Sequence, residues 1–197
     1  MDIDEKLYRK NLLSVRLVGH LTTPDSGFLI QGSKSATRDS ETGELESVAK
    51  YIKEEMDPQM VYLLGPGTTV EKIGERLGVK KTLLGVDIVK GDGTVLGRDV
   101  GESQLLEQAR KGPVKIIVSP IGGQGFLFGR GNQQISSRVL RLVGVENLIV
   151  LASRTKFELL EPKRLLVDTG DSELDRKLRG YRRVVTGYRE EMVLKVE

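Results

Sequence analysis

The sequence of 197 residues has no cysteine and a single histidine. The absence of cysteine excludes disulfide bonds, thiolate metal sites and cysteine nucleophiles, and one histidine cannot supply a multi-histidine metal site. We expect that histidine, His20, to be an ordinary strand residue. No apolar run approaches the ~18 residues that cross a bilayer, and the first ten residues are mostly polar. We therefore expect a cytoplasmic protein without a membrane partner.

Neither sign of charge dominates, because 31 basic residues against 28 acidic ones give a net charge of +3. Only residues 176–183 are locally basic, and such a run is more often a solvated helix face than a nucleic-acid footprint. We expect no nucleic-acid partner. What the sequence does contain is a globular composition, with 38% hydrophobic and 30% charged residues, in a chain long enough to bury a core.

The first 45 residues lack the alternation of strand and helix patterns that fills the rest of the sequence, and we predict a domain boundary between the two segments. Residues 1–45 form an N-terminal strand and mobile loop segment, with a strand at Leu12–Leu21 and a Gly-, Ser- and Thr-rich loop at Gln31–Gly43. Residues 46–197 form an α/β ligand-binding domain. At the junction, apolar residues at helical spacing predict an amphipathic helix over Glu44–Met56.

From Met60 onward, short apolar runs alternate with helical segments. The predicted strands are Val61–Leu64, Lys81–Val86, Lys115–Ser119, Asn147–Ala152, Arg164–Val167, Arg183–Thr186 and Met192–Val196. The predicted helices are Thr69–Leu77, Ser103–Lys111, Ser136–Val143 and Ser172–Leu178. Strands that lack polar alternation and are separated by helices predict an open, mostly parallel sheet with helices on both faces. In such sheets ligands bind at the carboxyl ends of the strands.

The first candidate loop lies between a predicted strand and a predicted helix. Gly65 and Gly67 permit a tight turn with exposed amides, Thr68 or Thr69 can cap the helix, and amides at a helix N-terminus attract phosphate. A capped strand-to-helix turn without any ligand would have the same residues. The pattern favours neither interpretation over the other.

The second candidate is the segment 119–134, which follows another predicted strand. It holds five glycines in ten residues, an entropic cost that a purely structural loop seldom carries, so we expect close approach of its backbone to a ligand. Arg130 can clamp a phosphate, whereas Phe126 and Phe128 are expected to pack in the core. The predicted ligand contacts in this segment are Gly122, Gly123, Gln124, Gly125, Arg130, Gly131 and Asn132.

The sequence GDGT at Gly91–Thr94 matches part of the GGDGT phosphate-binding signature of the NAD and diacylglycerol kinase superfamily. That signature needs a strand before it and a helix after it, whereas here short apolar runs lie on both sides. We predict a hairpin turn instead.

Carboxylates follow several of the predicted strands. Asp87 and Asp168 are candidate ligands for a metal ion, or for a ribose hydroxyl, and they should lie near the glycine-rich loops if the sheet is parallel. Asp171 is a candidate too, but we expect it to be a helix N-cap. Lys34 offers a further positive charge for a phosphorylated ligand.

These stretches together resemble the carboxyl-terminal region of the ATP-NAD kinase-like proteins of archaea and bacteria, including relatives associated with acetoin catabolism. The matching stretches are MDIDE, FLIQGSK, YLLGPGTT, TLLGVD, SPIGGQGFLFGRGNQQIS, VDTGD and VVTGYRE. In that family an amino-terminal domain with the GGDGT motif binds the phosphates of ATP and supports transfer to the 2′-hydroxyl of NAD. The 197 residues do not contain that domain, so the resemblance implies Mg²⁺ and ATP only for the family as a whole, and NAD as a ligand.

Two further similarities bear on the ligand. The segment 119–134 is similar to the Thr-Pro-Thr-Gly-Ser-Thr-Ala-Tyr segment of NAD kinases. Pro120 and Gly122 match that segment, whereas Gly123, Gln124 and Phe126 stand where it has Ser, Thr and Tyr. The order of loops and strands also resembles sugar-phosphate isomerases of the ribose-5-phosphate isomerase type. Those enzymes need a carboxylate base beside the glycine-rich loop, and none is present here, so this similarity concerns the fold.

Our leading hypothesis is therefore a nucleotide- and NAD-binding domain of an NAD kinase-like phosphotransferase of NADP biosynthesis. Phosphoryl transfer would need an N-terminal kinase domain or subunit, so we expect no catalysis from this chain alone. The alternative is a sugar-phosphate or nucleotide-phosphate binding protein of isomerase-like fold. A third, non-catalytic interpretation is a dimerisation domain, and we expect a homo-oligomer.

Overall fold

The computed structural model describes residues 2–3, 6, 15–16, 38–121, 123, 125–160 and 163–197. The chain divides into two compact units, residues 1–30 and 31–197. In the first unit, β1 (Asp2–Ile3) pairs antiparallel with β2 (Val15–Arg16). The predicted strand at Leu12–Leu21, with His20, otherwise lies outside the described residues.

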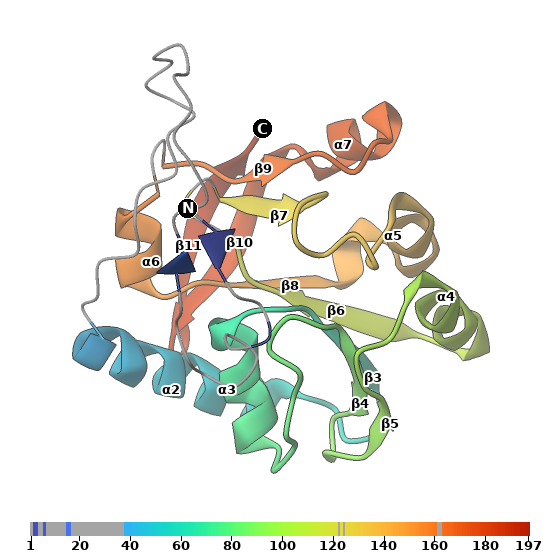
Figure 1. Cartoon of the computed structure of the whole chain (residues 1–197), viewed down its shortest axis with the longest axis horizontal. Coiled ribbons are helices and arrows are strands. Elements are labelled where there is room, and N and C mark those ends of the chain that lie inside the picture. Colours follow the sequence, from blue (N-terminus) through green and yellow to red (C-terminus); the bar gives the residue numbers. More distant parts are fainter. Residues whose placement is uncertain are drawn as a thin grey trace. The chain divides into compact units, whose positions relative to one another are not determined.

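The second unit is built on a seven-stranded sheet with the order β11-β10-β8-β6-β3-β4-β5 (Figure 1). Its strands are β3 (Val61–Leu64), β4 (Asp87–Lys90), β5 (Val95–Gly97), β6 (Val114–Val118), β8 (Leu148–Leu151), β10 (Gly180–Gly187) and β11 (Glu190–Val196). The four inner strands β10, β8, β6 and β3 run parallel, whereas β11, β4 and β5 are joined to the sheet by antiparallel pairings. The prediction of an open, mostly parallel sheet is confirmed.

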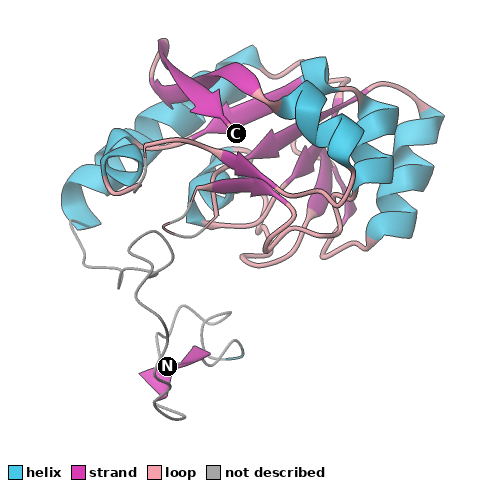
Figure 2. Cartoon of the chain, turned by 90° about the horizontal axis from the view of Figure 1, so that it is seen from above, coloured by secondary structure: helices cyan, strands magenta, loops and turns pink. Residues whose placement is uncertain are grey.

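Helices cover both faces of this sheet, as predicted (Figure 2). They are α2 (Arg38–Glu55), α3 (Thr68–Arg76), α4 (Glu102–Lys111), α5 (Ser137–Val143), α6 (Arg154–Glu158) and α7 (Ser172–Leu178), with a 3-10 turn at Val145–Asn147. Residues of α2 and α3 pack in one apolar cluster with Tyr62, Leu64 and Ile117 of the sheet. Residues of α4, α5 and α7 pack in the other.

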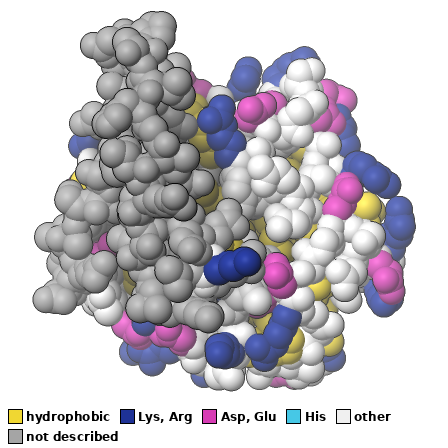
Figure 3. All heavy atoms as spheres, in the orientation of Figure 1, with side chains coloured by type: hydrophobic (Ala, Val, Ile, Leu, Met, Phe, Trp, Pro, Cys, Tyr) yellow, Lys and Arg dark blue, Asp and Glu magenta, His cyan; other side chains and the backbone are white. Residues whose placement is uncertain are grey.

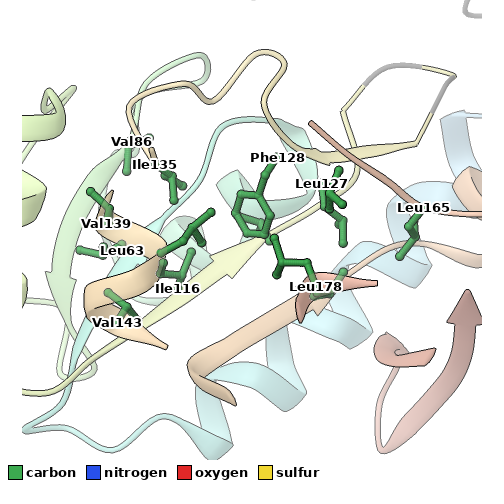
Figure 4. Packing of buried hydrophobic residues seen from close by; sticks show 14 of the residues in the cluster. Leu63, Val86, Ile116, Leu127, Phe128, Ile135, Val139, Val143, Leu165 and Leu178 are labelled. Atoms are coloured by element: carbon green, nitrogen blue, oxygen red, sulfur yellow. The ribbon is translucent and has the colours of Figure 1, made fainter. Parts of the chain in front are cut away.

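The second cluster also holds a small parallel sheet formed by β7 (Phe126–Phe128) and β9 (Leu166–Val167). Figure 4 shows Phe128 and Leu127 of β7 pointing into this cluster, toward Ile116 of β6 and Leu178 of α7. The prediction did not include β7, because three residues between glycines read as part of a loop. The core in this region is therefore partly built by the glycine-rich segment itself.

Two predicted elements are wrong. The run Lys81–Val86 is a loop, and the strand is the following segment β4, which lies antiparallel to β3. The predicted loop at Gln31–Gly43 is helical from Arg38, since α2 begins there. Contacts with residues far along the chain stabilise the N-terminal part of this helix. Glu41 accepts a hydrogen bond from the Ser153 hydroxyl at 3.3 Å, and Glu44 accepts one from the amide of Thr155 at 3.2 Å.

The hairpin prediction at Gly91–Thr94 is confirmed, because β4 and β5 pair antiparallel around it. The Asp92 carboxylate accepts a hydrogen bond from the Thr94 amide at 2.8 Å, and Gly93 has a φ of 93°.

On the molecular surface, basic and acidic side chains are interspersed over the face drawn in Figure 3. Within the described parts of the chain, no helix is long and apolar enough to cross a membrane.

Candidate functional site

The carboxyl ends of β3, β6 and β8 meet at one edge of the sheet, which we call the strand-end edge. The loop after β3 is joined to the end of β6 by a hydrogen bond from the Gly65 amide to the Ile117 carbonyl oxygen, 2.9 Å long. Asp87 begins β4 opposite Leu64, because β4 runs antiparallel to β3. The loop after β3, the end of β6 and Asp87 therefore lie together at this edge.

The loop 65–69 leads from β3 into α3, and its two glycines serve different purposes. A Cβ atom on Gly65 would lie 2.9 Å from Cγ1 of Val118, so the close packing of β3 on β6 requires this glycine. Gly67 faces open space and has a φ of 107°, and its amide donates to the Leu83 carbonyl oxygen at 2.8 Å. Because Gly67 has no side chain, it does not cover the backbone amides at the start of α3.

The threonines of this loop do not act as predicted. Gly67 is the N-cap of α3 and no side chain caps the helix, so the expectation that Thr68 or Thr69 does so is wrong. Thr68 is exposed at the first position of the helix. Thr69 is buried, and its hydroxyl has no hydrogen-bond partner among the described residues. A buried hydroxyl without a partner costs about 1–3 kcal/mol, and a bound ligand is one way to recover it.

A buried polar cluster braces this loop from the side of β4. Both oxygens of Asp87 are engaged, since they accept hydrogen bonds from the Thr82 amide at 2.8 Å, from the Thr82 hydroxyl, and from the Asp99 amide at 2.8 Å. Lys81 donates to the carbonyl oxygens of Thr82 and Gly85. These bonds fix the loop 81–86, which carries the Leu83 carbonyl that receives the Gly67 amide.

Burial lowers the pKa of Lys81 to about 8, although the nearby carboxylates of Asp87, Glu71 and Asp99 act in the opposite direction. The Lys81 side chain lies against α3, where a Cβ on Gly74 would approach its own Cβ to 2.9 Å. An ammonium group that is mostly cut off from water loses hydration, and two carbonyl oxygens replace only part of it.

The glycines after β6 owe their positions largely to contacts within the chain. A Cβ on Gly125 would lie 2.7 Å from the Arg164 carbonyl oxygen, and a Cβ on Gly129 would lie 1.7 Å from that of Asp168, next to β9. Gly131 has a φ of 73° and approaches Ile121. By contrast, Gly123 is exposed and faces open space. Gly122 and Gln124 lie outside the described residues.

The other predicted contacts in this segment have mixed surroundings. Phe128 is buried, which confirms its place in the core, whereas Phe126 is half-buried beneath Arg130, whose guanidinium lies 4.3 Å from the ring centroid. Asn132 is fully buried, and its amide donates to the Leu127 carbonyl oxygen at 2.7 Å. Its side-chain oxygen has no partner in the described part of the chain.

The remaining predicted residues do not gather into one site. Asp168 is exposed after β9, outside the main sheet. Asp171 is confirmed as an N-cap, and its hydrogen bonds from Arg141 lower the pKa of its carboxyl group to about 2. Lys34 lies outside the described residues. Over the described ranges, no group of three or more His, Cys, Asp or Glu side chains is placed to hold a metal ion.

Sequence reasoning missed one basic residue at the strand-end edge. Lys156 lies on α6, just after β8, and its ammonium donates a hydrogen bond of 2.9 Å to the hydroxyl of Ser119, the first residue after β6. Ser153 is a residue type that favours the start of a helix, but nothing in the local sequence indicates the contact between Lys156 and Ser119. The predicted strand Asn147–Ala152 ends before this residue, and the sequence pattern predicts no helix at the position of α6.

A surface hollow of about 570 Å³ lies elsewhere, between α2 and the last turn of α3. Its lining residues are Lys50, Lys53, Glu54, Glu75 and Arg76. None of them belongs to the loops at the strand-end edge, and the hollow lies at the end of α3 opposite to Thr68. The chemistry of the two places is therefore separate.

Comparison with known proteins gives one family match. The sequence model of the ATP-NAD kinase C-terminal domain family matches residues 57–196, which is nearly all of the seven-stranded unit. No curated protein and no solved structure matches the chain.

Proposed function

The chain belongs to the ATP-NAD kinase C-terminal domain family, and from this we propose that it binds a nucleotide, NAD in the first place, at its strand-end edge. The loop 65–69 and the segment after β6 form that edge. The residues proposed to line it are Gly65, Gly67, Thr68, Thr69, Gly122, Gly123, Gln124, Gly125, Arg130, Gly131 and Asn132.

One observation carries this proposal: the open backbone around Gly67 at the start of α3. Among the residues that the structure describes, nothing lies within 4 Å of the position that a Cβ of Gly67 would take, so they leave a ligand room to approach. The first amides of a helix have no partner within the helix, and the helix dipole adds partial positive charge there. A phosphate group is the natural ligand for such a position.

The family as a whole uses Mg²⁺ and ATP, and the described carboxylates can be compared with what a metal ion needs. Mg²⁺, when bound to ATP, would neutralise charge on the phosphates during transfer to the NAD 2′-hydroxyl. The described carboxylates do not fit a metal centre, because Asp87 is buried with both oxygens engaged and Asp168 is exposed on another sheet. We expect ligand binding without phosphoryl transfer unless an N-terminal kinase domain or subunit is supplied.

Ligand-dependent thermal stabilisation tests the proposal. NAD, NADP, ATP and pentose phosphates are each added to the purified chain, and a ligand present at 100 times its dissociation constant should add about 2.7 kcal/mol of stability. We expect stabilisation by NAD or NADP. Stabilisation by pentose phosphates alone would support the alternative, a sugar-phosphate binding protein, and robust NAD phosphorylation by this chain would contradict the expected lack of catalysis.

The position of the ligand is tested by a matched pair of glycines at the two ends of α3. Gly67 and Gly78 both have positive φ, 107° and 72°, and in the described part of the chain neither has an atom within 4 Å of its Cβ position. Gly67→Ala and Gly78→Ala should therefore both lower stability through backbone strain. Only Gly67→Ala should weaken NAD binding, and equal weakening by both variants would place the ligand elsewhere.

Self-association is a separate proposal. Tyr181 and Val193 lie on the outer hairpin of the sheet and are 76% and 63% exposed, so a second copy of the chain that packed there would bury them. We expect a homo-oligomer, and light scattering during size-exclusion chromatography measures its mass.

A further inference from the structure

The contact between Lys156 and Ser119 joins the ends of two parallel strands. Ser119 directly follows β6 and is 2% exposed, whereas Lys156 comes from α6 after β8 and is half-buried. The 2.9 Å hydrogen bond brings a positive charge to the middle of the strand-end edge, since β6 lies between β3 and β8. On the other side of β6 lies the loop that leads into α3.

The position of Lys156 is set by its own helix. The Ser153 hydroxyl accepts a hydrogen bond from the Lys156 amide at 3.0 Å, which caps α6, and Ser153 itself is fully buried. Glu44 of α2 accepts from the Thr155 amide, so a carboxylate already lies at the N-terminus of α6. Phosphate binding at that helix end is thus disfavoured.

Lys156 also differs from Arg130, the charged residue that the sequence singled out. Arg130 is exposed and lies over the ring of Phe126, next to the β7–β9 sheet. Lys156 is held at the strand-end edge by a buried hydroxyl, and partial burial strengthens the attraction between a cation and a phosphate. A compact ammonium group commonly binds phosphate as a point charge.

We infer that Lys156 is a phosphate-binding residue of the strand-end edge and that Ser119 is its positioning residue. The ligand class is a phosphate or diphosphate group, such as the diphosphate of a dinucleotide. This inference rests on the proposed function, because it names the cation of the same site. The Ser119 hydroxyl holds the ammonium in place, which reduces the entropy that Lys156 loses when the ligand binds.

Isothermal titration with NADP and with inorganic pyrophosphate tests the inference. Lys156→Met keeps most of the apolar stem but removes the charge, and we expect at least about tenfold weaker binding of both probes, since a hydrogen bond to a charged group contributes about 1.5–3 kcal/mol. Lys156→Arg should restore part of the affinity. Ser119→Ala should weaken binding less than Lys156→Met, while leaving the charge in place.

Salt dependence separates a charge contact from a structural effect. The affinity of the unaltered chain should fall more steeply with salt than that of Lys156→Met, because one screened ion pair is lost in the variant. The matched control is Lys111→Ala on α4, which removes an exposed lysine that pairs with Glu107 at 2.7 Å. Binding of NADP and pyrophosphate should be unchanged in this control.

The outcomes distinguish the two levels of the proposal. If the unaltered chain binds none of NAD, NADP and pyrophosphate, the proposed function and this inference both fail. If it binds them and Lys156→Met binds equally well with the same salt dependence, only the inference fails. A loss of affinity in Arg130→Ala but not in Lys156→Met would assign the phosphate contact to Arg130 instead. If Lys156→Met does not fold, the same titrations with Lys156→Gln decide the matter.

Discussion

The two glycine-rich loops at the strand-end edge look alike in sequence, yet they are held in place by different means. The short loop 65–69 is braced by the polar cluster around Asp87 and Lys81, through the hydrogen bond from the Gly67 amide to Leu83. The long segment after β6 is braced by its own strand β7, which pairs with β9. One loop depends on buried charges, and the other depends on backbone packing.

The glycines of both loops therefore fall into two groups. Gly65, Gly125 and Gly129 are required because another part of the chain comes too close for a Cβ atom. Gly67 and Gly123 have no described atom near their Cβ positions, so their backbone leaves room for a ligand. A high glycine count is thus evidence of close approach, but the approaching group is often the protein itself.

The largest expected effect tests this division within one segment. Gly129→Ala should lower the free energy of unfolding by at least about 3 kcal/mol, because the new Cβ would lie 1.7 Å from the Asp168 carbonyl oxygen and the φ of Gly129 is 94°. Gly123→Ala should stay within about 1 kcal/mol of the unaltered protein. Urea unfolding measures both, and similar losses in the two variants would refute the division.

The next effect tests the brace of the short loop. Asp87→Ala should cost about 3 kcal/mol, since it leaves the Thr82 and Asp99 amides without their acceptor in a buried position. Asp168→Ala, at an exposed carboxylate, should cost no more than about 0.5 kcal/mol. Thermal unfolding of both variants provides the comparison, and a small loss for Asp87→Ala would mean that the cluster does not support the loop.

Much of this fold could be predicted from local patterns, but the brace of the short loop could not. The strand Val61–Leu64 and the helix Ser172–Leu178 agree with their predicted bounds, because apolar runs and capping residues define them locally. The strand near Asp87 was misplaced, since two short apolar runs adjoin each other and periodicity does not distinguish them. Only the antiparallel pairing with β3 decides between the two.

The candidate site shows the same limit. Both loops were located from their glycines, which mark backbone positions directly. The reason for Gly129 depends on β9, and the importance of Lys156 depends on Ser119, which lies on another strand end. Contacts of this kind join residues far apart in the sequence, so a single sequence carries no signal for them.

An effect of similar size, but dependent on pH, concerns the buried lysine beside the short loop. The pKa of Lys81 falls from 10.5 to about 8 in the folded state, so between pH 8 and pH 10.5 the unfolded chain binds more protons at this residue. Stability then rises with pH across this window, by up to about 3 kcal/mol. Lys81→Met removes this titrating group. From pH 7 to pH 10, the unfolding free energy of the unaltered protein should therefore rise relative to that of the variant. A difference that stays constant over this range would show that the lysine titrates normally.

The smallest effect separates stability from binding at the start of α3. Thr69→Val replaces a buried hydroxyl that has no partner among the described residues, so the ligand-free protein should gain up to about 1 kcal/mol. If the hydroxyl serves a phosphorylated ligand, the same variant should bind NAD several-fold more weakly. Thr68→Val at the exposed neighbour is the control for stability. A stability gain with unchanged NAD affinity would mean that the Thr69 hydroxyl does not contact the ligand. The loop 65–69 could then be a structural turn, as its sequence alone also allows.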